Sequence, residues 1–186
     1  MPATVIPVTG LNLGPVGSVS QSDFPLRTPR QVRPADTKNI AFGEPVVLND
    51  DNTYSSVAQF IAGGGTLAAT TPLGLAAANT RTNPSFSMAG NSGVMTPAGF
   101  YAPGNIADVM SKGTMNVQVN NGTPKAGGTV YIRVAANGAI PAGVVGGIEA
   151  VADGANSIAV NCMKFKTGVM GADGTAQVTI LTRVLP

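Results

Sequence analysis

The chain has 186 residues, of which 44% are hydrophobic and only 11% are charged, against about 25% charged residues in a typical soluble domain. It contains no histidine and one cysteine, which excludes Ser-His-Asp and Cys-His catalytic groups, imidazole-based metal sites and an intrachain disulfide. The 24 glycines and 14 prolines favour short strands over long helices. The net charge of +2 is too small for bulk nucleic-acid binding. No apolar run reaches the roughly 18 residues that a membrane span needs.

Residues 1–38 are predicted to form an extended N-terminal arm. Six of the 14 prolines lie in this segment, and each restricts its own φ and pushes the preceding residue toward extended geometry. The apolar residues follow neither the helical nor the strand period, so the segment is not expected to bury enough surface to order by itself. It also carries the whole net charge of +2, since the rest of the chain is neutral. We therefore expect the body to fold without it.

A basic motif near the end of this arm is the candidate binding site. It consists of Arg27, Pro29, Arg30, Arg33 and Pro34. The guanidinium groups suit either nucleic-acid phosphates or the carboxylates of an acidic protein surface, and the interleaved prolines suit a preformed extended ligand. A third interpretation is a solvated linker. We favour contact with a protein over direct contact with nucleic acid, because the body offers no supporting basic face.

Residues 39–186 are predicted to form an all-β body. The first strand is expected within 41–48. The Asx-rich run 49–52 is expected to be a plain turn, because it lacks the spaced glycine and the distal glutamate of a calcium loop. The stretch 61–100 is rich in small residues and indicates a loop or an insertion, within which 73–78 form either a short strand or a helical turn.

The pattern becomes clearer after Tyr101. Alternating apolar and polar residues predict strands at 115–119, 130–134 and 157–162, and a C-terminal hairpin over 165–184. No convincing amphipathic helix lies between them. This arrangement favours an antiparallel β-barrel or sandwich, jelly-roll or tulip-like, over a βαβ fold. The predicted fold class is therefore all-β with an extended N-terminal arm.

The acidic residues and the cysteine do not predict a reaction centre. A glycosidase could use two carboxylates, but its sugar subsites would favour aromatic platforms, and this chain has no tryptophan and three tyrosines. Asp153 and Asp173 precede glycines and are interpreted as turn formers. Cys162 lies in a strand pattern and is expected to be buried in the core. We expect no catalytic residue, no metal site and no cofactor, and therefore no enzyme.

Several runs of the body, taken together, resemble a known family. They are Tyr101–Val109, Asn121–Val134, Gly146–Ala150, Asp153–Ser157, Phe165–Val169 and Val178–Leu181. In order and spacing they resemble the structural cement, or head decoration, proteins of tailed bacteriophages. The run 41–47 also resembles the first body strand of that family. The likeness covers 39–185.

The resemblance implies a non-enzymatic virion protein on the outer capsid surface, made in the host cytoplasm. The expected partners are the major capsid protein, whose neighbouring subunits it clamps against the pressure of packaged DNA, and further copies of itself. A homotrimer is expected, with a homodimer as the alternative. No direct nucleic-acid partner and no membrane partner is expected. The competing function is a virion-surface accessory adhesin that binds host glycans, which would favour exposed aromatic residues.

Overall fold

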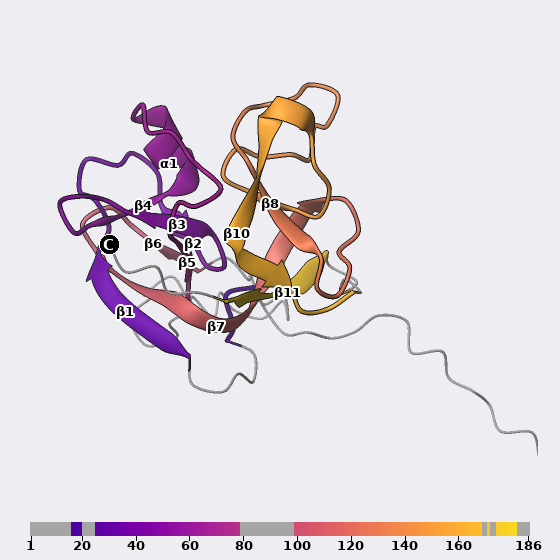
Figure 1. Cartoon of the computed structure of the whole chain (residues 1–186). Coiled ribbons are helices and arrows are strands. Elements are labelled where there is room, and N and C mark those ends of the chain that lie inside the picture. The colour runs from indigo at the N-terminus through magenta and orange to yellow at the C-terminus, as the bar shows by residue number, and fades with distance from the viewer. Residues whose placement is uncertain (1–15, 20–24, 79–98, 169–170, 172–173, 182–186) are drawn as a thin grey trace, which may run out of the picture.

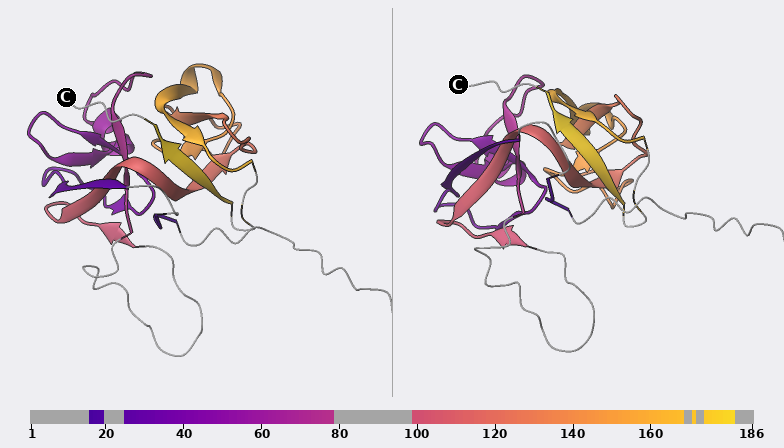
Figure 2. Two further views of the ribbon diagram at one scale, coloured as in Figure 1. Left: turned by 60° about the horizontal axis from the view of Figure 1, so that its bottom comes forward. Right: turned by 90° about the horizontal axis from the view of Figure 1, so that it is seen from below.

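The computed structural model describes residues 16–19, 25–78, 99–168, 171 and 174–181, and it consists of two β-rich lobes that share one long strand (Figure 1). This strand is β7 (Ile106–Asn121). Its first half pairs with strands of the N-terminal lobe, and its second half pairs with strands of the C-terminal lobe. Figure 2 shows β7 crossing from one lobe to the other in two further views. The all-β prediction is confirmed.

The C-terminal lobe is a closed β-barrel. Its strands are the second half of β7, β8 (Thr129–Arg133), β9 (Ile148–Glu149), β10 (Ser157–Phe165) and β11 (Thr175–Ile180). Strand β11 pairs with β7 and β10, β10 pairs with β8, and β8 pairs with β9. The ring closes where β9 pairs with β7 in parallel. A 3-10 turn, η1 (Gly154–Asn156), leads into β10.

These elements confirm the strands predicted from alternation. The expected strands at 115–119 and 157–162 lie in β7 and β10, and the one at 130–134 corresponds to β8, which ends at Arg133. The hairpin expected over 165–184 is confirmed in its second strand, β11, but its first strand is the end of β10, which stops at Phe165 and pairs with β11 through residues 163–165. Its residues 169–170, 172–173 and 182–184 lie outside the described residues.

The N-terminal lobe closes in a similar way. Its strands are β1 (Leu26–Gln31), β3 (Pro45–Leu48), β4 (Tyr54–Ser56) and β5 (Leu73–Ala76). Two further short strands, β2 (Ile40–Ala41) and β6 (Phe100–Tyr101), pair with each other. From β1 the order runs through the first half of β7 to β5, β3 and β4. A bridge between Val32 and Tyr54 completes the ring, and the Arg33 amide donates to the Tyr54 carbonyl at 2.8 Å.

Residues 25–38 differ from the expectation of an arm 1–38 separate from a body 39–186. Strand β1 pairs with β7 over its whole length, and Val32 is fully buried. Pro29 is tolerated within this strand because β1 has a ladder partner on one side only and Pro29 is exposed. This part of the predicted arm therefore belongs to the body. Residues 1–15 and 20–24 lie outside the described residues.

The stretch 61–100 is also more regular than an insertion. Strand β5 lies between β3 and β7 with Leu75 fully buried, so the short-strand alternative is confirmed for 73–76. A helix not expected from the sequence, α1 (Val57–Ala62), precedes it, and its N-cap hydroxyl, Ser56 Oγ, accepts the Gln59 amide at 3.3 Å. Residues 79–98 lie outside the described residues.

The two lobes share their hydrophobic packing. Successive residues of β5 and of β7 face opposite sides of the sheet. Leu75 and Met110 belong to the larger core, which fills the C-terminal barrel. Their neighbours Ala76 and Val109 belong to the smaller core inside the N-terminal lobe. Both faces of these strands are therefore buried. Cys162 lies in the larger core at 6% exposure, as expected. Because this core spans β5, β7 and the C-terminal barrel, we expect the lobes to behave as one body.

Gly113 marks the point where β7 changes lobes. Lys112 pairs with Leu26 of β1, whereas Gly113 pairs with Ile180 of β11. The φ angle of Gly113 is +125°, which side-chain-bearing residues rarely adopt. Gly113→Ala is expected to lower the free energy of unfolding by about 1–3 kcal/mol, measured by urea denaturation. Gly138→Ala is the control, because a Cβ added at Gly138 would meet open space and its φ is not in the positive range. An equal loss of unfolding free energy in the two variants would contradict the explanation from the backbone angle.

Candidate functional site

The predicted arginine–proline motif lies along one side of the N-terminal lobe. Arg27 and Pro29 are on the exposed side of β1, and Arg30 is on its half-buried side. Arg33 and Pro34 are exposed in the turn that follows. The structure therefore brings these five residues together on one strand and its end.

Each arginine of this motif already has a partner in its own chain. The contacts are Arg27 Nη1 to Asp108 Oδ2 at 3.3 Å, Arg33 Nε to Asp51 Oδ2 at 3.8 Å and Arg30 Nη1 to Asn52 Oδ1 at 2.8 Å. The side chains of Arg33 and Asp51 are 48% and 51% exposed, and exposed pairs of this kind contribute little to stability. Hydrogen bonds from Thr53, assisted by the Arg33 charge, lower the pKa of Asp51. The motif therefore presents partly satisfied cations at the surface.

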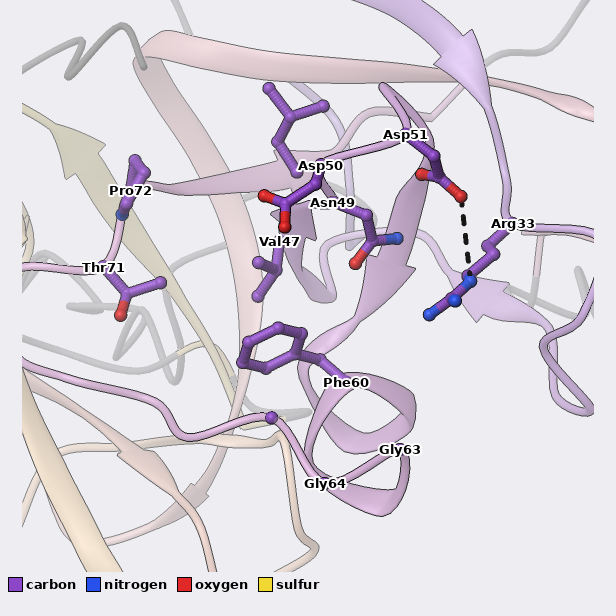
Figure 3. A pocket seen from close by; sticks show the side chains of 12 residues that line it. Arg33, Val47, Asn49, Asp50, Asp51, Phe60, Gly63, Gly64, Thr71 and Pro72 are labelled. Carbon is purple, nitrogen blue, oxygen red and sulfur yellow. Dashed lines mark ion pairs between the residues drawn. The ribbon is translucent and has the colours of Figure 1, made fainter.

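A groove of about 570 Å³ opens beside the Arg33–Asp51 pair (Figure 3). The turn after β3, helix α1 and the loop before β5 line it. Figure 3 shows Val47 and Phe60 near one another, with Asp50 on the rim above them. The turn 49–52 is confirmed here, since the Asn52 amide donates to the Asn49 carbonyl at 3.0 Å. Chemically, the groove can accept an apolar side chain next to a carboxylate.

A buried ion-pair network lies in the C-terminal lobe, on the face of β8 and β9 opposite to the core residues Ile132 and Ile148, where the loop containing Gly143 covers it. Arg133, at the end of β8, is fully buried and donates through Nε and Nη2 to both carboxylate oxygens of Glu149, which is also fully buried. Its Nη1 donates to Asp153 Oδ2 at 2.7 Å. Hydrogen bonds from Asn137, followed by those from Arg133, lower the pKa of the Asp153 carboxyl. These four side chains are called the Arg133 network below.

The Arg133 network is a structural element that the sequence did not reveal. Asp153 was expected to be a turn former, and it does accept the Asn156 amide at the start of η1, but it also pairs with Arg133. Glu149 lies 16 residues from Arg133, and no motif joins them. The only signal was an arginine that follows three hydrophobic residues at the end of a predicted strand. The Arg133–Glu149 pair links β8 to β9, and the Arg133–Asp153 pair adds the residue before η1. Neither Arg133 nor Glu149 has exposed surface with which to contact a substrate.

Other acidic groups do not form a reaction centre among the described residues. Burial raises the pKa of Glu44, whose carboxylate accepts the Ala41 amide at 2.8 Å in the turn before β3. Within the ranges that the structure describes, no three His, Cys, Asp or Glu side chains are grouped so that they could hold a metal ion. In the same ranges, none of the helices has the length and apolar character to span a membrane.

Comparison with known families decides the class of the protein. The family model described as "Structural cement protein (E217 gp24/Pam3 gp6)" matches residues 7–181, which is nearly the whole chain. The chain belongs to the structural cement protein family of phages. The resemblance seen in the sequence is thereby confirmed, and it includes the N-terminal region from residue 7 onward, which the resemblance had left out.

A solved structure supports the fold of this cement protein. A chain in "The capsid of Myoviridae Phage XM1" matches it with a TM-score of 0.60 and 16% sequence identity, covering 99% of each chain. At that identity the likeness concerns the fold alone. No curated protein matches the sequence. Family membership makes this cement protein a structural component associated with a phage particle.

Proposed function

We propose that this cement protein is a non-enzymatic clamp on the outer surface of a bacteriophage head, where it binds neighbouring major capsid subunits and stabilises the shell against DNA pressure. The observation that carries the proposal is the family match over residues 7–181. After synthesis in the host cytoplasm, the protein would reside on the virion. It needs neither nucleic acid nor a membrane as a direct partner.

The two-lobed body suits such a role. A stable protein interface buries on the order of 800 Å² per partner, which is an area that one lobe can present. Since the lobes share β7 and the larger core, contacts made by one lobe on one subunit would hold the other lobe near the next subunit. The second contact would then form at a high effective concentration. A clamp built in this way requires surface area and rigidity, and no catalytic group.

We further propose that Arg27, Pro29, Arg30, Arg33 and Pro34 contribute to the capsid contact. The guanidinium groups of Arg27 and Arg33 each retain N–H donors beyond their present ion pairs, and they can bind carboxylates of a partner. Repeated contacts on a symmetric shell favour a closed homo-oligomer. We propose a homotrimer, with a homodimer as the alternative, and the mass measured by light scattering separates the two.

The test uses heads of the phage that encodes this chain, prepared without the protein. Adding the purified protein is expected to raise the temperature at which the heads release DNA, measured with a DNA-binding dye, because bound copies tie neighbouring subunits together. An unrelated β-barrel protein at equal concentration is the control. Failure to bind the heads, together with binding to host glycans on an array, would overturn the clamp in favour of an accessory adhesin.

A further inference from the structure

The acidic residues described in the C-terminal lobe form ion pairs within that lobe. Among the described residues of that lobe, the acids are Glu149 and Asp153, and both are bound to the buried Arg133. Both carboxylates therefore already have a cationic partner within their own lobe. Three lysines remain on the outside of this barrel: Lys125, Lys164 and Lys166. We call them the lysine patch.

The lysine patch is assembled from two segments that are adjacent in space. The Gly127 amide donates to the Phe165 carbonyl at 2.8 Å, and the Phe165 amide donates to the Gly128 carbonyl at 3.1 Å. This pairing places the loop with Lys125 beside the end of β10. Lys164, in β10, is half-buried, and Lys166, directly after the strand, is exposed. Because Phe165 between them is buried, the two lysines lie on the same outer face.

The lysine patch lacks an anionic partner within the described part of the chain. Lys164 Nζ donates to the neutral hydroxyl of Thr129 at 3.1 Å, which fixes its direction without neutralising it. None of the three ammonium groups forms an ion pair with a described carboxylate, in contrast to Arg27 and Arg33 on the other lobe. The patch therefore consists of three ammonium groups that no described carboxylate neutralises.

We propose that the lysine patch is a docking surface for a carboxylate-rich protein surface on the phage head. The proposal rests on the proposed function and names a contact on the lobe opposite to the arginine–proline motif. A protein partner fits better than a nucleic acid, because three ammonium groups on a chain of net charge +2 neutralise too few phosphates for stable binding at physiological salt. Complementary charge across an interface also steers association and sets its orientation.

The test compares two variants with the same change in charge. Lys125→Gln/Lys166→Gln removes two exposed charges of the patch, and Lys38→Gln/Lys112→Gln removes two exposed charges elsewhere. Binding to heads that lack the protein is measured by co-sedimentation at low and at high salt. The patch variant is expected to bind about 3–10-fold more weakly at low salt, with a smaller difference at high salt, because ions screen exposed pairs. The control variant is expected to bind within about twofold of the natural protein.

Each outcome has one meaning when thermal unfolding shows that both variants remain folded. Natural protein that does not bind heads overturns the proposed function. Natural protein that binds, with equal binding by the patch variant at every salt, overturns only the docking surface. Binding of the natural protein to duplex DNA under the same conditions, lost in the patch variant, would overturn the choice of a protein partner. Charge reversal, Lys125→Glu/Lys166→Glu, is expected to weaken head binding more than the glutamine variant does.

Discussion

Glu149→Ala is expected to lower the free energy of unfolding by about 3–5 kcal/mol, because it leaves the buried Arg133 guanidinium without its bidentate partner. Arg133 has no exposed surface, and it would keep only its hydrogen bonds to Asp153 and to the Ala135 carbonyl. The loss would fall on the junction of β8, β9 and η1. Urea denaturation of the purified protein, followed by circular dichroism, measures it.

A second variant distinguishes the destabilisation caused by an unpaired buried charge from the net contribution of the ion pair to stability. Arg133→Met/Glu149→Met removes both charges and keeps comparable side-chain volume. Replacing a buried ion pair by apolar residues is often neutral or stabilising, so the double variant is expected to be more stable than Glu149→Ala. A double variant that unfolds as readily as Glu149→Ala would show that packing, and not the unpaired charge, causes the loss. A loss below about 1 kcal/mol in Glu149→Ala would contradict the whole account.

Deleting residues 1–38 is expected to prevent folding of the N-terminal lobe. The deletion removes β1, its pairing with β7 and the fully buried Val32, and it opens the ring at the bridge to Tyr54. It also removes the contact in which the Gly17 amide donates to the Asn116 carbonyl at 2.8 Å. Amide hydrogen exchange is expected to show rapid exchange in β3, β4 and β5. Such an outcome would overturn the expectation from the sequence that the body folds without residues 1–38.

Deletion of residues 1–15 is the matched control, because it keeps every contact given above for the two lobes. This shorter variant is expected to unfold at nearly the same urea concentration as the full chain, and slow exchange in β3, β4 and β5 is expected to persist. If the variant without residues 1–38 shows equally slow amide exchange in those strands, β1 is dispensable for folding. That outcome would support the original prediction of a separate arm. Head binding by the shorter variant measures what residues 1–15 add to the proposed clamp.

The strands of the C-terminal barrel could be predicted because their signal is local. Alternation around Val130 and Ile132 identifies a half-buried strand without knowledge of its partners. Strand β1 could not be predicted in this way, because Pro29 is acceptable only on a strand with one open side, and that openness depends on which strands lie beside it. Helix α1 is too short, at six residues, to show a period.

For the candidate surfaces too, the sequence identified local features but not the partners that long-range contacts supply. Arg27 and Arg33 were identified from their clustering in the sequence, but their partners Asp108 and Asp51 lie 81 and 18 positions away and were not evident. Neither the Arg133 network nor the lysine patch has a sequence motif, since each joins segments that only pairing of β8, β9 and β10 brings together.

Local patterning by itself determined that this protein is all-β, that its turns fall at the Asx and glycine clusters, and that histidine-dependent chemistry is absent. Those properties depend on residue type and on neighbours within a few positions. Only the tertiary structure decided that β7 serves two lobes, that residues 26–32 belong to the body and that Arg133 is buried and paired with Glu149 and Asp153. These features depend on contacts between residues far apart in the chain. Such contacts form only when the burial they share outweighs the entropy lost in closing the intervening loops.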